Sequence, residues 1–211
     1  MRAWVISNGN IVDYDFFRNM ISETDLIICA DGGAKHAQKI GVTPDVIIGD
    51  LDSIEQHCYH DMIAKNIQII NYSTDKDETD TQLAVEYAIQ RGCEEIILIG
   101  SLGSRFDHSF ANVSLLKLVL DKGIKGRIIN ENNEIYLIND YIQLRGKVGE
   151  KLSLLPLTPN VFGITTKGLQ YGLNNAQMKF GIPNGISNVF IKPEAEITIK
   201  EGLLLVIKAR D

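Results

Sequence analysis

Acidic residues are concentrated between residues 73 and 84, where the chain reads STDKDETDTQLA. Asp75, Asp77, Glu78 and Asp80 fall within six positions there. Carboxylates this close together repel one another unless water or a cation neutralises them. Mg2+ prefers oxygen ligands and commonly bridges one or two carboxylates to phosphate oxygens. The segment is therefore a candidate metal and phosphate site.

Three other segments place acids or glycines directly after an apolar run. LIICA leads into DGG (31–33), VIIG into DLDS (50–53), and IILIG into GSLGSRFDH (100–108). Glycines here would let backbone N–H groups approach a phosphate, and Arg105 could clamp one. Acids and anion-binding groups are compatible in one place if Mg2+ lies between them. Asp50 with Asp52, and Asp77 with Asp80, have suitable spacing to share such ions.

Simpler roles remain open for each motif taken alone. Asp50 and Asp52 would also suit a solvated turn, and Asp31 followed by two glycines is a common turn sequence. Thr79 or Asp80 could simply cap the helix that follows. His108 could be a helix-start residue or a core histidine. We favour a shared site because all the motifs follow predicted strands.

The first 125 residues alternate short apolar runs with helical patterns. Runs such as LIICA, VIIG and IILIG are apolar at every position, which is typical of parallel strands covered by helices on both faces. Gly41, Gly92 and Gly123 are each placed to end a helix. Ligands of such sheets bind at the carboxyl ends of the strands. We therefore expect the four polar segments to meet at one rim.

Short strands separated by Gly, Pro and Asn follow, without a convincing helical period. The sequence therefore predicts an N-terminal three-layer α/β domain with a parallel sheet, residues 1–125, followed by a smaller all-β sandwich domain, residues 126–211. We expect the boundary between residues 126 and 140.

The bulk composition excludes some classes of partner. The 211 residues are 45% hydrophobic, which is enough for a sizeable core, and the net charge is −6 with a pI near 5.3. An acidic chain is poorly suited to binding nucleic acid or an anionic membrane, so a small molecule is the expected partner. Cys29, Cys58 and Cys93 lie far apart, which favours reduced thiols and a cytoplasmic protein.

The ordered set of motifs resembles the bacterial thiamin pyrophosphokinases. The matching segments are DGG (31–33), PDVIIGDLDS (44–53), DKDETD (75–80), GSLGSRFDH (100–108), GLQY (168–171) and GISN (185–188). The resemblance covers nearly the whole chain. It implies transfer of diphosphate from ATP to the hydroxyethyl group of thiamin, giving thiamin diphosphate and AMP. It also implies Mg2+ as cofactor and a homodimer with active sites at the subunit interface.

Site residues follow from the resemblance position by position. Catalytic roles fall to Asp50, Asp52, Asp77, Asp80 and Arg105, and the first four would also bind the metal. The expected nucleotide-site residues are Asp31, Gly32, Gly33, Ser53, Lys76, Gly100, Gly103, Asp107 and His108. Thiamin contacts are expected from Thr79, Tyr171, Ser187 and Asn188.

Some assignments stay open at this point. The sole tryptophan, Trp4, is expected in the core, so Tyr171 or Phe190 would supply any aromatic surface facing thiamin. Asp77 or Asp80 would accept the proton of the thiamin hydroxyl, and Lys76 or Arg105 would add positive charge as AMP leaves. Two alternatives are another Mg-nucleotide-dependent kinase of a small alcohol and a non-catalytic thiamin or nucleotide sensor.

Overall fold

The chain forms two compact units, Met1–Glu131 and Asn132–Asp211, in a computed structural model that describes residues 1–52 and 62–210. Ser53 and Cys58 lie outside the described residues.

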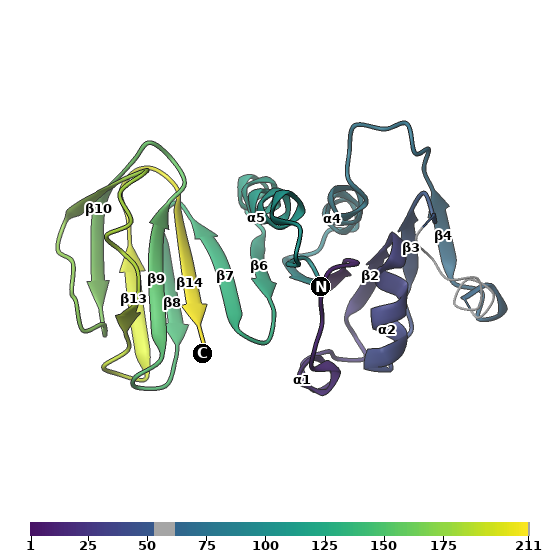
Figure 1. Cartoon of the computed structure of the whole chain (residues 1–211), viewed down its shortest axis with the longest axis horizontal. Helices are drawn as coiled ribbons and strands as arrows, with labels where there is room; N and C mark the ends of the chain where they lie inside the picture. Colours follow the sequence, from purple (N-terminus) through teal and green to yellow (C-terminus); the bar gives the residue numbers. More distant parts are fainter. Residues whose placement is uncertain (53–61, 211) are drawn as a thin grey trace. The chain divides into compact units, whose positions relative to one another are not determined.

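The first unit is built on a parallel sheet of six strands (Figure 1). Neighbouring strands follow the order β6-β5-β1-β2-β3-β4, and every pair among them is parallel. Their bounds are β1 Arg2–Ile6, β2 Leu26–Ala30, β3 Val46–Gly49, β4 Gln68–Asn71, β5 Glu95–Ile99 and β6 Lys125–Ile129. The carboxyl ends of these strands therefore lie on one edge of the sheet.

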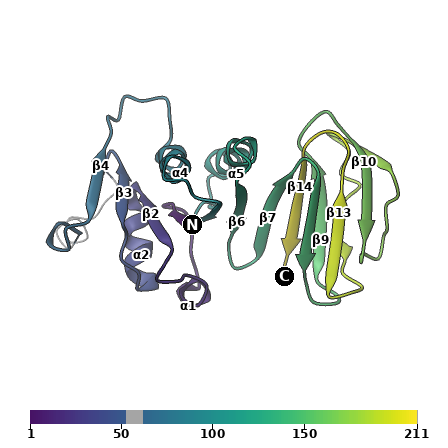
Figure 2. The ribbon, with the colours of Figure 1, turned by 180° about the vertical axis from the view of Figure 1, so that it is seen from behind.

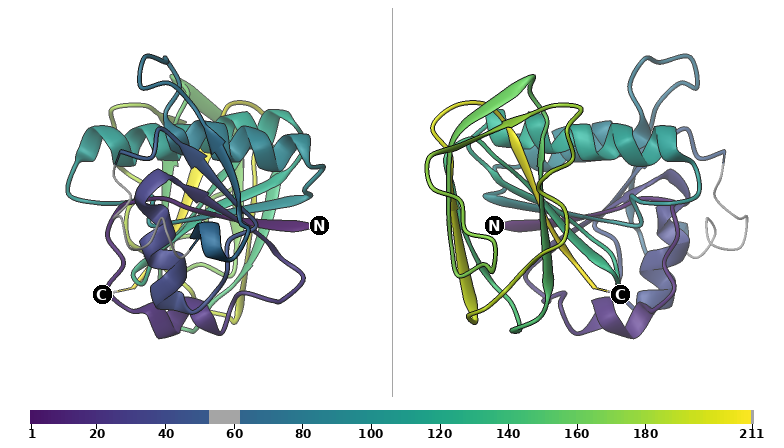
Figure 3. Two further views of the ribbon diagram at one scale, coloured as in Figure 1. Left: turned by 90° about the vertical axis from the view of Figure 1, so that its right-hand side faces the viewer. Right: turned by 60° about the vertical axis from the view of Figure 1, so that its left-hand side comes forward.

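Helices cover both faces of this sheet. Helices α1 (Tyr14–Arg18) and α2 (Ala34–Ile40) contact each other on one face, and α4 (Asp80–Gln90) and α5 (Phe106–Asp121) contact each other on the other face (Figures 1 and 3). Gly41, Gly92 and Gly123 follow their helices with φ values of 89°, 73° and 69°, which confirms their predicted role as helix ends. The predicted three-layer α/β architecture is confirmed.

The core of this unit is mainly apolar. All five residues of β2 are buried, because helices pack on both of its faces. Trp4 and Cys29 are fully buried, as expected, and the indole nitrogen of Trp4 donates to Asp25 at 2.8 Å. Cys29 and Cys93 form no disulfide within the described part of the chain.

The second unit consists of two antiparallel sheets, one ordered β12-β9-β14-β7 and the other β11-β10-β13-β8. Their inward side chains, among them Leu152, Ile164, Phe190 and Val206, form one hydrophobic core. The bounds are β7 Asn133–Ile138, β8 Tyr141–Arg145, β9 Lys151–Pro156, β10 Asn160–Lys167, β11 Ala176–Lys179, β12 Asn188–Val189, β13 Glu194–Thr198 and β14 Leu204–Ala209. The predicted sandwich is confirmed.

The structure differs from the sequence expectation in three details. β6 pairs with β5 inside the first unit, whereas the expected division at residue 125 placed most of it in the second domain. Strands β8 and β11 were not expected, because their outward residues are polar and their apolar signal is short. The segment ISNVFIK forms only the two-residue strand β12, followed by a single bridge between Phe190 and Leu169.

Among the residues described, none of the helices combines the length and the apolar character needed to cross a lipid bilayer.

Candidate active site

A cavity of about 550 Å³ opens in the first unit where five parallel strands end. It is lined by residues that follow β1, β2, β3, β4 and β5, and by residues of α4 and α5. The four polar segments identified in the sequence all contribute to it. The lining residues include Ser7–Asn10, Asp31, Asp50, Asp52, Thr74, Lys76, Glu78–Thr81, Gly100–Arg105, His108, Ser109 and Asn112.

Three carboxylates gather inside this cavity. Asp31, Asp50 and Asp80 each offer an oxygen within 4.8 Å of the others. Asp31 is only 7% exposed, and its Oδ1 has no hydrogen-bond partner among the described residues. An unpaired buried carboxylate oxygen is costly unless a cation or another donor reaches it. We call Asp31, Asp50 and Asp80 the acid cluster.

Lys76 supplies positive charge to the acid cluster. Its Nζ lies 2.9 Å from Oδ1 of Asp80 and 3.8 Å from Oδ2 of Asp50, and its side chain is 12% exposed. Burial opposes the charge of Lys76, but the hydrogen bond to Asp80 and the nearby carboxylates outweigh it and raise the pKa of Lys76. Burial raises the pKa of Asp80, and Asp50 and Asp31 add to this effect, so the contact with Lys76 offsets only part of the repulsion.

The acid cluster fits a hard divalent cation. It presents carboxylate oxygens, one of them buried without a partner, and its three formal negative charges exceed the one positive charge of Lys76. Two of the four expected metal ligands lie elsewhere. Asp52 is exposed on the cavity wall, and Asp77 is exposed and does not line the cavity. Asp31, which the sequence assigned to the nucleotide, takes their place in the cluster.

Gly32 and Gly33 permit close packing of the backbone. They form the short 3-10 turn η1 (Asp31–Gly33) and are buried. A Cβ on Gly33 would lie 2.0 Å from the backbone oxygen of Ile6, and one on Gly32 would lie 2.5 Å from the Asn8 side chain. Neither glycine lines the cavity. In this structure they bring the acid cluster against the end of β1, and the expected contact with phosphate stays a prediction.

The loop after β5 closes another side of the cavity. Gly100 has a φ of 59°, and its backbone approaches Ser7 too closely to admit a Cβ. Gly103 donates its N–H to Ser109 Oγ at 3.0 Å. Arg105 lies at the cavity rim and forms an exposed ion pair of 2.5 Å with Asp107, which lowers the pKa of Asp107 to about 2.

His108 lines the cavity from the first turn of α5, whereas Asp107 is not among the lining residues. Thr79 caps α4, because its side chain accepts a hydrogen bond of 3.2 Å from the N–H of Gln82. The capping alternative left open in the sequence therefore holds for Thr79. Asp80 instead points its carboxylate at Lys76.

Sequence reasoning missed the loop after β1 as part of the cavity. Ser7, Asn8, Gly9 and Asn10 line it, and this segment is held to the β5 loop by hydrogen bonds from Gly9 N to Gly100 O (2.6 Å) and from Asn10 N to Leu102 O (3.1 Å). The signal was present, since SNGN follows the first apolar run just as the other motifs follow theirs.

Buried polar residues on the two helices were also missed. Thr81 is 3.0 Å from Ser7 through their hydroxyl oxygens, and Asn112 donates to the backbone oxygen of Ser101 at 2.7 Å. All four residues line the cavity. Thr81 and Asn112 lie inside helical patterns and gave no sequence signal, because only the tertiary structure turns their side chains toward the strand ends.

The expected thiamin contacts in the second unit differ in exposure. Tyr171 is 64% exposed and Ser187 is exposed, whereas Asn188 is 8% exposed. Phe190 is fully buried in the sandwich core. Of the two candidate aromatic residues, Tyr171 is therefore the one whose ring is accessible.

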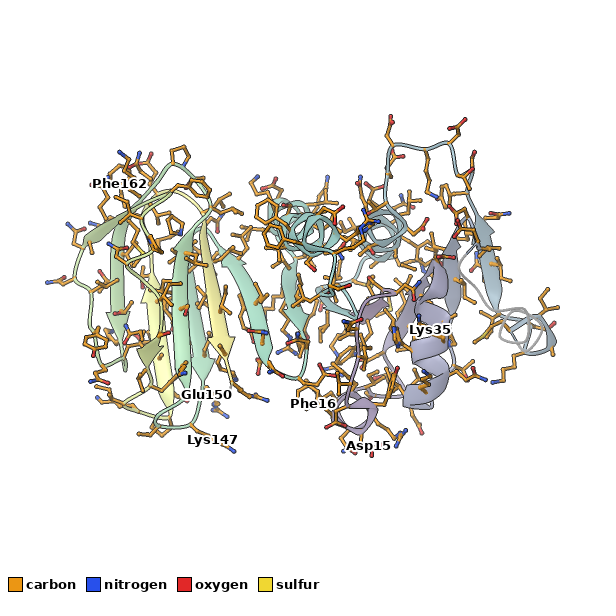
Figure 4. All side chains as sticks on the ribbon, in the orientation of Figure 1. Asp15, Phe16, Lys35, Lys147, Glu150 and Phe162 are labelled. Carbon is orange, nitrogen blue, oxygen red and sulfur yellow. The ribbon has the colours of Figure 1, made fainter. Side chains whose placement is uncertain are left out.

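A second hollow lies at one end of the sandwich unit, beside the loop between β8 and β9 that carries Lys147 and Glu150 (Figure 4). Its basic residues are largely neutralised by acids. Lys208 pairs with Glu134 at 2.8 Å, and Arg210 pairs with Glu134 at 3.0 Å and with Glu150 at 3.1 Å. These ion pairs link the end of β14 to β7 and to the loop between β8 and β9.

The fold and the cavity define a two-domain protein with a ligand-binding α/β unit, whose site lies at the strand ends, and a β-sandwich unit. Comparison with known proteins agrees. The family model described as "Thiamin pyrophosphokinase, catalytic domain" matches residues 17–128, and "Thiamin pyrophosphokinase, vitamin B1 binding domain" matches residues 139–204. The chain belongs to the thiamin pyrophosphokinase family.

Individual relatives support the same assignment. The thiamine pyrophosphokinase of Bacillus subtilis is 28% identical over 191 residues, covering 90% of this chain and 89% of the relative. Its crystal structure superposes with a TM-score of 0.91 at 24% identity, covering all of both chains. A family protein from Enterococcus faecalis gives a TM-score of 0.83 at 26% identity, again covering all of both chains.

Proposed function

We propose that this chain transfers a diphosphate group from ATP to the hydroxyethyl oxygen of thiamin, giving thiamin diphosphate and AMP. The observation that carries the proposal is the acid cluster, which lies in a cavity at the strand ends of a unit matched by the family's catalytic domain. Family membership supports ATP and thiamin as the two substrates.

The metal part of the proposal rests on the donor set. Asp31, Asp50 and Asp80 would hold Mg2+, with Asp52 on the adjoining wall. When bound, Mg2+ neutralises charge on the ATP phosphates. Transfer of this kind needs little covalent help from the protein, so positioning and charge neutralisation supply most of the acceleration.

The chain's own residues would orient the reactants. The backbone of the Gly100–Arg105 loop borders the cavity, and Arg105 at the rim would add positive charge as AMP leaves. Of the two carboxylates expected to take the proton of the thiamin hydroxyl, Asp80 lines the cavity and Asp77 does not. Asp80 is therefore our choice.

The sandwich unit would provide the thiamin contacts. The vitamin B1 binding family model covers Tyr171, Ser187 and Asn188. The accessible Tyr171 ring offers a flat surface for the cationic thiazolium, through a cation–π contact. The net charge of −6 favours approach of this cation.

We also propose a homodimer with active sites between subunits and a location in the cytoplasm. The dimer is tested by light scattering of the purified chain, where a monomer mass at assay concentration contradicts it. The location is tested by cell fractionation.

Product analysis tests the reaction. The purified chain is incubated with ATP, MgCl2 and thiamin, and we expect AMP and thiamin diphosphate in equal amounts, with neither formed when Mg2+ or thiamin is omitted. ADP as the nucleotide product would contradict diphosphate transfer and favour a small-alcohol kinase. Binding of thiamin by calorimetry without turnover would favour a sensor.

A further inference from the structure

Lys76 occupies the position in the acid cluster where a cation is needed. Its ammonium contacts Asp80 at 2.9 Å and Asp50 at 3.8 Å, and also hydrogen-bonds the backbone oxygen of Ser73 at 3.2 Å. The side chain is 12% exposed, which is unusual for a lysine on a loop. Lys76 is thus an internal counter-ion of the acid cluster.

The single charge of Lys76 leaves the acid cluster incompletely neutralised. Oδ1 of Asp31 is buried and has no hydrogen-bond partner among the described residues. A divalent cation among the three carboxylates would satisfy this oxygen. Such an ion would also repel the ammonium at short range, since charges a few ångströms apart in a partly buried site interact strongly.

Lys76 lies on a largely exposed loop. Residues 72–79 connect β4 to α4 and project beyond the sheet edge (Figure 2). Most residues of this loop are exposed, and its neighbours Thr74 and Glu78 line the same cavity. A released Lys76 side chain therefore stays beside the cavity, where a phosphate group would meet it.

We propose that Lys76 is a displaceable counter-ion: it neutralises the metal-free acid cluster, and a divalent cation expels its ammonium from Asp80 into the cavity. The inference rests on the proposed function because it takes Asp31, Asp50 and Asp80 as the metal ligands. The inference adds that metal binding releases the Lys76 ammonium to contact the phosphates of ATP.

Chemical labelling of amines tests the displacement directly, without ATP or thiamin. The chain is acetylated with N-hydroxysuccinimidyl acetate, with and without MgCl2, at constant ionic strength set by NaCl. Mass spectrometry then compares Lys76 with Lys122, which is exposed at the end of α5. We expect Mg2+ to increase labelling of Lys76 several-fold and to leave Lys122 unchanged. Unchanged or decreased labelling of Lys76 at saturating Mg2+ overturns the proposal.

Paired variants add a second measurement. Lys76→Met removes the internal cation, and we expect Mn2+ to bind the nucleotide-free variant roughly tenfold more tightly by calorimetry, because its competitor is gone. Lys117→Met is the matched control, since Lys117 forms the same i,i+4 ion pair with Asp121 on the exposed face of α5. Equal or weaker Mn2+ affinity in Lys76→Met, with Lys117→Met unchanged, contradicts competition. Product analysis tests the reaction itself, so the two proposals can fail separately.

Discussion

The side-chain amide of Asn188 forms hydrogen bonds in both directions with the backbone of Tyr171. The Tyr171 N–H donates to Oδ1 at 3.0 Å, and Nδ2 donates to the Tyr171 oxygen at 2.8 Å. The N–H of Val189 donates to the same Oδ1 at 2.9 Å. These contacts tie GLQY to GISN, two motifs that lie far apart in the sequence. We infer that Asn188 positions the exposed Tyr171 ring.

Replacing Asn188 therefore tests how much its side chain contributes to stability and to the position of Tyr171. Asn188→Ala leaves three backbone groups without their partner, and we expect a loss of about 2 kcal/mol in the free energy of unfolding, measured with urea. We also expect a raised KM for thiamin because Tyr171 loses its support. Asn174→Ala, at an exposed asparagine nearby, is the control and should change neither quantity. Unaltered stability in Asn188→Ala would show that water replaces the amide.

Gly33 is predicted to tolerate no side chain. In Gly33→Ala the added methyl would overlap the backbone oxygen of Ile6, and neither backbone moves easily, so we expect a loss of about 3 kcal/mol or more. Gly172→Ala is the control, because nothing lies within 4 Å of its added carbon. Thermal melting of both variants is the measurement. Equal melting temperatures would contradict the close approach.

Substitutions of two aspartates test whether Asp31 of the acid cluster or Asp77 of the DKDETD segment is a metal ligand. Asp31→Asn keeps the side-chain shape but removes a buried charge, and we expect turnover to fall about 100-fold or more. Asp77→Asn changes an exposed residue outside the cavity lining, and we expect a much smaller decrease. AMP release at saturating ATP and thiamin measures both. The reverse order of effects would restore Asp77 to the metal site, as the motif alone predicted.

His36 makes the first unit sensitive to acid. Its Nε2 donates to the oxygen of Gly9 at 2.8 Å, and Nδ1 accepts from the Tyr14 hydroxyl at 3.0 Å. Burial lowers the pKa of His36 to about 4. The unfolded chain, with an ordinary histidine pKa near 6.5, then binds a proton more readily than the folded chain between these values.

The stabilising contribution of His36 is therefore complete above about pH 6.5 and is lost as the pH falls toward 4. We expect this histidine to account for a loss of about 3 kcal/mol by pH 4. Urea unfolding at a series of pH values measures it, and His36→Gln should flatten that part of the profile. Parallel profiles for the two proteins would show that His36 does not titrate in this range.

The strand-end rule explains why so much of the site was predictable. Apolar runs such as LIICA and IILIG are typical of strands buried on both faces, and parallel strands place their carboxyl ends together. Asp31, Asp50, Lys76 and Asp80 were therefore expected at one rim, and the structure brings them together. The order of motifs likewise identified the family before any fold was known.

Other features required the folded chain. Spacing in the sequence grouped Asp77 with Asp80 and Asp52 with Asp50, but each pair contributes only one member to the cluster. Leu51 has a φ of 67°, which interrupts the extended backbone between Asp50 and Asp52, and Asp80 begins α4 whereas Asp77 lies in the loop before it. Asp31 joins them because Gly33 lets its turn pack against β1. The sequence thus determines which residues follow the strands and lie near their carboxyl ends. The directions of those side chains depend on packing between distant segments, and so do the contacts of Lys76 with the acid cluster and of Asn188 with Tyr171.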